Sequence, residues 1–222
     1  DCSNRLDEMV LFPFTPAQRN GLEDLRLVRF EQDDGGFTYY GTYTAYSGKA
    51  ISSEILETRD FETFELRPLQ GSATRNKGMA LFPRSFDGDY LMIGRQDGES
   101  LYLLRSSDLN RWEHGELLAR PEYAWELIQI GNCGSPIELE EGWLVLTHGV
   151  GAMRKYSIGA LLLDRDDPSR VIGRTAVPLL SPSDEAREGY VPNVVYTCGA
   201  LAHAGRLIMP YGVADSSVSF AS

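Results

Sequence analysis

The sequence contains no long hydrophobic run. Nowhere in its 222 residues do 18 apolar residues follow one another, which excludes a membrane-spanning helix. Cysteine is equally scarce, and Cys2, Cys133 and Cys198 are too few and too far apart for a disulfide scaffold or a zinc site. We therefore expect reduced, structural thiols, a cytoplasmic protein, and no metal ion or other cofactor. The first residue is Asp1 rather than methionine, so the sequence gives no information on an export signal.

Positive charge is also in deficit. Lys and Arg total 21 against 32 Asp and Glu, which gives a net charge of −11 at pH 7. Nucleic acids and anionic membranes attract basic surfaces, so we expect neither as a partner. A local cluster of Arg, Lys and His could still bind a small anion. A chain of this length with 42% hydrophobic residues can bury a sizeable core, and homo-oligomerisation is left open.

Helical patterning is weak throughout the chain. Residues 17–28 have some helical spacing and residues 182–190 could form a helical turn, but neither segment shows a sustained 3.6-residue period. No linker or change of composition divides residues 1–222, so we expect a single, nearly all-β domain. The expected strands lie near residues 26–31, 37–46, 52–57, 79–83, 89–95, 101–106, 135–139, 143–149, 158–164, 193–199 and 206–212.

One pattern occurs four times in the sequence. A short apolar strand ends in a small or polar residue and a glycine turn, and the starts of these segments are 50, 53 and 64 residues apart. Strand-rich units at such a period are typical of β-propeller blades. The segments are YYGTYTAYSG (39–48), DYLMIGRQDG (89–98), GWLVLTHGVG (142–151) and RLIMPYGVAD (206–215). Asp-containing turns of the kind held by side-chain bonds recur at residues 57–66, 105–114 and 163–172.

The register of this repeat brings two basic side chains to one level. When the apolar strands are aligned, Arg95 and His148 occupy the same position, and Asp215 lies three residues beyond it in the last repeat. The innermost strand of each blade lines the central channel of a propeller, and equivalent positions face the same axis. We therefore expect Arg95 and His148 to converge on one cavity, the alternative being that Arg95 is a solvated rim residue.

The most densely charged segment precedes the first expected strand. In NGLEDLRLVRF (20–30), Glu23, Asp24 and Arg26 lie between apolar residues. One interpretation is an ordinary solvent-exposed ion pair with Arg26 or Arg29. The other is a catalytic acid held by a neighbouring cation, as general acid–base chemistry on sugars requires.

Seven ordered motifs resemble those of glycoside hydrolase family 130, which contains β-mannoside phosphorylases and β-1,2-mannosidases. They are NGLEDLR (20–26), NKGMALFPRSFDGDYLMIGR (76–95), SSDLNRW (106–112), IQIGNCGSPIELEEGWLVLTHGV (128–150), YSIGALLLDRDDPSRVIGR (156–174), EGYVPNVVY (188–196) and YGVAD (211–215). The resemblance implies a five-bladed propeller with its active site in the central funnel. Because only four core repeats are present, we expect that the first blade and the extreme C-terminus are absent from this sequence.

The resemblance also implies catalytic and sugar-binding residues. Glu23, Asp24 and Arg26 match the acidic motif, with Leu25 in place of the family's proline. Asp24 would be the general acid, in several members acting through a hydroxyl of the bound mannose, and Arg26 would orient it. The residues that match positions holding mannose are Tyr156, Asn193 and Asp215. Two of them also have structural interpretations, Asn193 as a turn residue and Tyr156 as a strand aromatic.

The resemblance leaves phosphorolysis and hydrolysis to be distinguished. A phosphorylase needs two or three cations or strong donors around phosphate. Lys77, Arg95 and His148 fall at or near the matching positions, and Arg154 lies close by. Gln129 replaces a residue that is often lysine in the phosphorylases. A hydrolase needs a carboxylate base to activate water, and Glu99 or Glu126 could serve.

We expect inverting phosphorolysis of a β-mannoside oligosaccharide, with inorganic phosphate as co-substrate and mannose 1-phosphate as product. Three alternatives remain open. The first is an inverting β-mannosidase of the same family. The second is a furanosidase-type propeller with three acids on three blades, drawn from Glu23 or Asp24, Glu99 and Asp215. The third is a non-catalytic carbohydrate-binding propeller.

Overall fold

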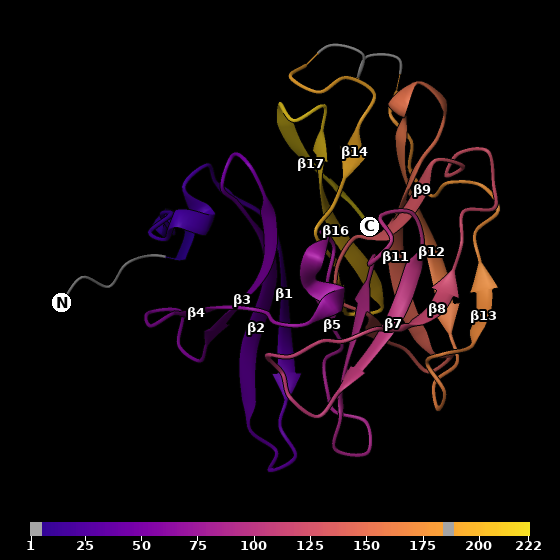
Figure 1. Cartoon of the computed structure of the whole chain (residues 1–222). Helices are drawn as coiled ribbons and strands as arrows, with labels where there is room; N and C mark the ends of the chain where they lie inside the picture. The colour runs from indigo at the N-terminus through magenta and orange to yellow at the C-terminus, as the bar shows by residue number, and fades with distance from the viewer. Residues whose placement is uncertain (1–5, 184–188) are drawn as a thin grey trace.

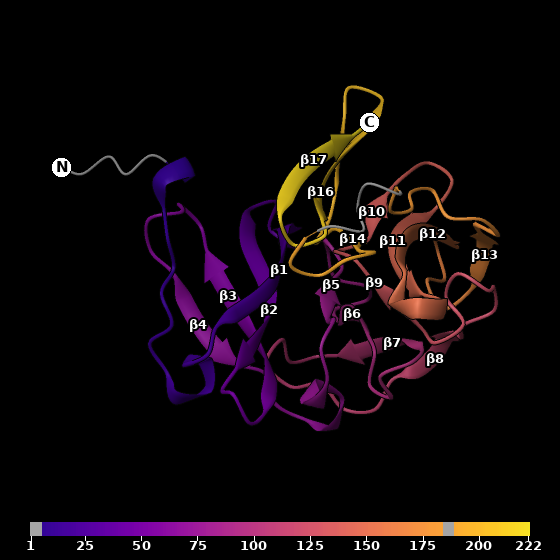
Figure 2. The same cartoon turned by 90° about the horizontal axis from the view of Figure 1, so that it is seen from above.

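The computed structural model describes residues 6–183 and 189–222 (Figure 1). Its regular structure is almost entirely β, arranged as four antiparallel sheets. Viewed from above, the sheets surround a common centre like the blades of a propeller (Figure 2). The expectation of an all-β, propeller-like fold is confirmed for the four blades that this chain contains.

The first two blades are four-stranded meanders. The first consists of β1 (Leu22–Glu31), β2 (Phe37–Tyr46), β3 (Ile51–Thr58) and β4 (Glu65–Pro68). The second consists of β5 (Ala80–Leu81), β6 (Tyr90–Gly94), β7 (Leu101–Ser106) and β8 (Glu116–Ala119). Consecutive strands pair antiparallel in both blades, so short hairpins suffice to connect them.

In the third and fourth blades, two short segments share the inner edge. The third blade consists of β9 (Gln129–Asn132), β10 (Ile137–Glu138), β11 (Trp143–Val150), β12 (Tyr156–Leu163) and β13 (Val171–Arg174), and both β9 and β10 pair with β11. The fourth consists of β14 (Val195–Tyr196), β15 (Leu201–His203), β16 (Arg206–Val213) and β17 (Ser217–Ala221). Both β14 and β15 pair with β16.

Helical structure among the described residues is limited to short 3₁₀ segments: η1 (Leu6–Glu8), η2 (Pro16–Gln18), η3 (Ser72–Arg75) and η4 (Ala152–Arg154). The helical spacing of residues 17–28 gives only the end of η2 before β1 begins. The expected turn at 182–190 falls mostly outside the described residues. No helix in the described part of the chain has the length and apolarity needed to cross a membrane.

The four sequence repeats coincide with β2, β6, β11 and β16, in register. These are the second strands of their blades, because β1, β5, β9 and β14 lie nearer the centre (Figure 2). The expectation that the repeated strands are the innermost ones is therefore wrong. The second strand has neighbours on both edges, and this explains its longer apolar run.

The recurring Asp turns are confirmed. Asp60, Asp108 and Asp164 each accept a backbone N–H two residues ahead, at 2.9, 2.9 and 3.0 Å. The turns follow β3, β7 and β12 and connect them with the last strands of their blades, β4, β8 and β13. The same local chemistry thus ends the same strand in three successive blades.

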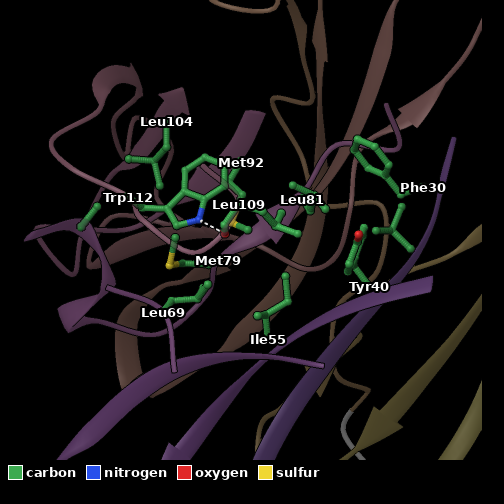
Figure 3. Close-up of a cluster of buried hydrophobic side chains, with 12 residues drawn as sticks. Phe30, Tyr40, Ile55, Leu69, Met79, Leu81, Met92, Leu104, Leu109 and Trp112 are labelled. Carbon is green, nitrogen blue, oxygen red and sulfur yellow. Dashed lines mark hydrogen bonds between the residues drawn. The ribbon is translucent and has the colours of Figure 1, made fainter. Parts of the chain in front are cut away.

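Each pair of neighbouring blades encloses a hydrophobic cluster. Figure 3 shows the cluster between the first and second blades, where Trp112 is fully buried and donates from Nε1 to the Leu109 carbonyl at 2.8 Å. A second cluster, around Phe82 and Trp143, joins the second and third blades. A third cluster, around Ile158 and Met209, joins the third and fourth. A fully buried Leu or Phe contributes roughly 1.5–3 kcal/mol, so these clusters set the relative positions of the blades.

The first and fourth blades each keep an exposed apolar face. In β1, Val28 and Phe30 are buried toward the second blade, whereas Leu27 on the opposite face is 41% exposed. In β17, Phe220 is 73% exposed. These two faces border one groove of about 740 Å³, here called the open groove. Its lining includes Leu25, Leu27, Leu201, Ile208, Pro210 and Phe220.

Candidate active site

All four blades contribute side chains to a hollow of about 460 Å³ near the centre, here called the central hollow. Most of the residues singled out in the sequence meet there. The lining includes Glu23, Asp24, Arg26, Lys77, Arg95, Gln129, Asn132, His148, Arg154, Tyr156, Tyr196 and Asp215. The convergence of Arg95 and His148 is confirmed, because Arg95 Nη1 lies 3.3 Å from His148 Nε2.

Asp24 lies at an irregularity in β1. The pairing of β1 with β2 shifts between Glu23 and Arg26, and Asp24 has a φ of 59°. Asp tolerates this left-handed conformation better than most residues, and the bulge re-aims its side chain. The carboxyl group remains 32% exposed. It is therefore held by the strand but accessible from the hollow.

Arg26 is buried beside Asp24, with 2% of its side chain exposed. Its Nε donates to the Cys133 carbonyl at 3.2 Å and its Nη1 to the Asp24 carbonyl at 3.0 Å. Its Nη2 lies 3.5 Å from Asp24 Oδ2 and donates to the Tyr196 hydroxyl at 2.6 Å. A guanidinium with this many fixed partners forms a rigid support for the acidic group.

Sequence reasoning missed Tyr196. Its hydroxyl donates to Asp24 Oδ2 at 3.3 Å, and its ring packs edge-on against His148 at a centroid distance of 5.0 Å. Burial raises the pKa of Tyr196 far above its usual range. In the sequence this residue ends the motif EGYVPNVVY. An aromatic residue after two valines is typical of a strand core, so Tyr196 was not singled out as a site residue.

Lys77 and Glu23 form an ion pair at the rim of the hollow. Lys77 Nζ lies 2.5 Å from Glu23 Oε2, and both side chains are more than a third exposed. Solvent screens such a pair, so its contribution to stability is small. The pairing nevertheless neutralises Glu23 and leaves Asp24 as the carboxyl held by Arg26.

His148 is not the additional cation that the sequence suggested. It is 4% exposed, and burial first, then Arg95 and Arg26, lower its pKa well below the usual value. A neutral imidazole can accept the Arg95 N–H at Nε2. The imidazole ring also stacks with the Tyr156 ring, at a centroid distance of 6.0 Å and an interplanar angle of 13°. His148 therefore positions Arg95 rather than adding charge.

Arg95 is half-buried, and burial lowers its pKa. Arginine stays protonated in proteins in spite of such shifts. Its Nε is buried without a hydrogen-bond partner, and no carboxylate of the described residues pairs with it. The hollow thus contains a guanidinium that forms no ion pair with a carboxylate of the described residues.

Three further predicted residues, two of which line the hollow, have left-handed backbone conformations. Arg154 and Asp215 line it and are exposed, with φ of 54° and 50°. Asn193, with φ of 64°, is not among the lining residues, but its carbonyl accepts the Tyr156 N–H at 2.9 Å. Left-handed conformations outside glycine are uncommon, and they gather at ligand sites where the surrounding structure enforces them.

The structure does not place the two candidate bases in the hollow. Glu99 is exposed and is not a lining residue. Glu126 is fully buried, accepts the backbone N–H of Tyr123 at 3.2 Å and pairs with Arg174. Its carboxylate is used to hold the segment between the second and third blades. Neither position corresponds to a water-activating base facing Asp24.

Cys133 and Cys198 are free thiols, as expected. Burial raises the pKa of Cys198 to about 11 and that of Cys133 further. Thiols with raised pKa values are poor nucleophiles, so these residues belong to the framework around Arg26. Within residues 6–183 and 189–222, no group of His, Cys, Asp and Glu is arranged to hold a metal ion.

Known sequences similar to this chain are mannoside phosphorylases. The beta-1,2-mannobiose phosphorylase of Listeria innocua is 35% identical over 96% of this chain and 61% of its own length. The 1,2-beta-oligomannan phosphorylase of Thermoanaerobacter sp. is 32% identical over 98% of this chain and 73% of its own length. The chain therefore spans about three fifths of the Listeria innocua relative.

Solved structures with a similar fold include a mannoside phosphorylase. The Listeria innocua beta-1,2-mannobiose phosphorylase, solved with beta-1,2-mannobiose, superposes with a TM-score of 0.83 at 32% identity, covering 95% of this chain and 60% of that one. A glycosyl hydrolase from Bacteroides ovatus shares the fold with a TM-score of 0.76 at 21% identity, covering 91% and 64%.

The family match extends over almost the whole sequence. Residues 3–222 match the family Glyco_hydro_130, described as beta-1,4-mannooligosaccharide phosphorylase. This match agrees with the ordered motifs and with the convergence of their residues on one hollow. The chain belongs to glycoside hydrolase family 130.

Proposed function

We propose that the protein cleaves β-mannosides by phosphorolysis and releases mannose 1-phosphate. One observation carries the proposal. Arg95, a guanidinium without a carboxylate partner among the described residues, lines the same hollow as Asp24. A positive charge beside a supported acid is what attack by phosphate on a glycoside requires. The names of the related phosphorylases support the same reaction.

In the proposed reaction, a phosphate oxygen attacks the anomeric carbon from the side opposite the leaving sugar. The new C–O bond forms as the glycosidic C–O bond breaks, and the leaving oxygen takes the proton of Asp24, directly or through a mannose hydroxyl. The configuration at the anomeric carbon inverts. Arg26 positions Asp24, and Tyr156, Asn193 and Asp215 are assigned to mannose.

Phosphate is assigned to the side of Arg95. Arg154 lines the hollow as a second arginine, Lys77 contributes a third positive charge at the rim, and Gln129 offers an amide donor. Hydrolysis would need a carboxylate to activate water. The carboxylates of the described lining are Glu23, Asp24 and Asp215, and Glu23 is already paired with Lys77. This donor set favours phosphate over a water-activating base.

We also infer that the whole propeller has five blades. The uncovered faces of the first and fourth blades border the open groove. In a closed propeller each of these faces packs against a neighbouring blade. A fifth blade supplied by the remainder of the natural polypeptide would cover both. The free thiols Cys133 and Cys198 support a cytoplasmic location.

The reaction is tested with the complete natural polypeptide. We expect mannose 1-phosphate from β-1,2-mannobiose or β-1,4-mannosyl-glucose only when phosphate is present. Free mannose released equally without phosphate would show hydrolysis instead. Asp24→Asn keeps a side chain that tolerates the left-handed backbone and should abolish the reaction while the protein stays folded. An active Asp24→Asn variant would refute the assignment of the acid.

A further inference from the structure

Tyr196, Arg26 and Asp24 form a closed triangle of polar contacts. Arg26 Nη2 donates to the Tyr196 hydroxyl at 2.6 Å and lies 3.5 Å from Asp24 Oδ2. The Tyr196 hydroxyl lies 3.3 Å from the same Oδ2. The two carboxyl oxygens of Asp24 therefore have different surroundings. Oδ2 faces one hydrogen-bond donor and one cation, and none of the described residues donates to Oδ1.

The direction of each hydrogen bond in this triangle follows from the chemistry of the groups. A guanidinium has no acceptor atom, so the Tyr196 oxygen must accept from Arg26. A tyrosine hydroxyl has a single proton, and that proton is then free to point at Asp24 Oδ2. The hydroxyl hydrogen of Tyr196 and the positive charge of Arg26, 3.5 Å away, both face Oδ2. They disfavour a proton of the carboxyl group at that oxygen, so the proton is left to Oδ1.

We propose that Tyr196 is a positioning residue that, together with Arg26, confines the transferable proton of Asp24 to Oδ1. This inference rests on the proposed role of Asp24 as the acid. The Tyr196 hydroxyl fixes the rotation of the carboxyl group, and Oδ1 presents its proton to the leaving oxygen or to the mannose hydroxyl that relays it. Proton transfer by a positioned acid depends on this geometry.

The test compares leaving groups in the complete natural polypeptide. Tyr196→Phe keeps the ring against His148 and removes the hydroxyl. We expect the kcat for β-1,2-mannobiose phosphorolysis to fall about 10–100-fold, with KM values for sugar and phosphate within about threefold of wild type. Turnover of 2,4-dinitrophenyl β-mannoside, whose leaving group needs no proton, should stay within about threefold.

Tyr43→Phe is the matched control. Tyr43 is also buried and donates to a carboxylate, Glu54 Oε2, at 2.6 Å, but it lies outside the central hollow. This variant should lose stability, but the ratio of its activity on β-1,2-mannobiose to its activity on the dinitrophenyl mannoside should equal that of the wild type. In a protein with 4-fluorophenylalanine at position 196, the fluorine atom fills the volume of the hydroxyl group but carries no proton. If Tyr196→Phe does not fold, this protein is used for the same measurements.

Each outcome separates the two proposals. A wild-type protein that forms no sugar phosphate contradicts the proposed function, whatever Tyr196 does. An active wild type with an unaffected Tyr196→Phe variant overturns the positioning role. That role is also overturned if the variant loses activity on both substrates by the same factor. A change in its KM values with an unchanged kcat overturns it as well. If the wild type does not accept the dinitrophenyl mannoside, the kinetics with β-1,2-mannobiose decide whether Tyr196 positions the acid. A lower kcat with unchanged KM values then supports the role, and an unchanged kcat overturns it.

Discussion

At the scale of single residues, charge pairing divides the cations of the central hollow into two groups. Lys77 and Arg26 each lie against a carboxylate, Glu23 or Asp24. Arg95 and Arg154 have no such partner among the described residues. An unpaired guanidinium can bind an incoming anion without first breaking an ion pair. The half-buried Arg95 is therefore the residue on which phosphate affinity should depend most.

Replacing Arg95 with glutamine tests this dependence. A charge-assisted hydrogen bond contributes about 1.5–3 kcal/mol, so we expect the KM for phosphate to rise about 10–100-fold. The KM for the mannoside should change little. Arg84→Gln provides the control, because Arg84 pairs with Glu138 outside the hollow. Equal phosphate KM values for the two variants would contradict the assignment.

The buried His148 makes stability depend on pH. Its pKa is lowered by burial, Arg95 and Arg26, so the folded protein binds fewer protons at this residue than the unfolded chain. Its contribution is complete above the ordinary imidazole pKa of about 6.5 and is lost as pH falls below that value. Between about pH 7.5 and 5.5, one such group removes about 1.4 kcal/mol from the free energy of unfolding.

Urea unfolding of His148→Gln measures this effect. The variant should lose less stability than the wild type over that pH range, by about 1.4 kcal/mol. A His148→Gln variant whose stability depends on pH in the same way as that of the wild type would show that the imidazole is not held neutral by the fold.

At the scale of strands, the pairing of β9 with β11 fixes the two basic side chains. Gly131 in β9 pairs with His148 in β11. A Cβ at Gly131 would lie 2.4 Å from His148 Cε1 and 3.2 Å from Arg95 Nη1. Real Cβ contacts are not that short, so glycine is required for the strand to approach both side chains. The position of Arg95 is thus set by the backbone of the next blade.

Gly131→Ala should therefore weaken phosphate binding without removing any polar group. The added methyl group displaces His148 and, through it, Arg95, and we expect the phosphate KM to rise about tenfold. Gly212→Ala, in β16, is the control, since its Cβ would meet only ordinary contacts at 3.8 Å and beyond. Unchanged phosphate kinetics in Gly131→Ala would mean that the imidazole and guanidinium can move aside freely.

The strands that could be predicted from the sequence are those with a strong apolar pattern. Each expected strand overlaps an observed one, and β2 and β7 agree with the prediction in both bounds. The strands without a prediction, β4, β8, β9, β13, β15 and β17, are short. Most are partly exposed, because a strand at the blade's edge buries one face at most and carries a weaker apolar signal.

The candidate site was predictable only where a motif or the repeat marked it. Asp24, Arg26, Arg95 and His148 were found in this way, and all line the hollow. Tyr196 ends one of the motifs but was not singled out, because its partners Arg26 and Asp24 are separated from it by 170 and 172 residues. The charge state of His148 was also beyond the sequence, since burial by neighbouring blades determines it.

At the scale of the whole molecule, the faces of the end blades differ from those between blades. Met209 in β16 is buried in the cluster that joins the third and fourth blades, whereas Ile208 and Pro210, its neighbours in the alternating strand, line the open groove. Leu25 and Leu27 of β1 line the same groove from the other side. Two unpartnered apolar faces that border one groove support the proposal of a fifth blade between them.

Phe220 gives the sharpest test of the fifth blade, because its ring is 73% exposed in the open groove. Val177 has the same exposed fraction but lies outside that groove. If a fifth blade covers β17 in the complete polypeptide, Phe220→Ser should lower the free energy of unfolding there by about 2–4 kcal/mol. In residues 1–222 alone it should have little effect on stability and should reduce self-association. Val177→Ser should change stability by less than about 0.5 kcal/mol in both forms, so equal small effects of the two substitutions in the complete polypeptide would show that β17 stays uncovered.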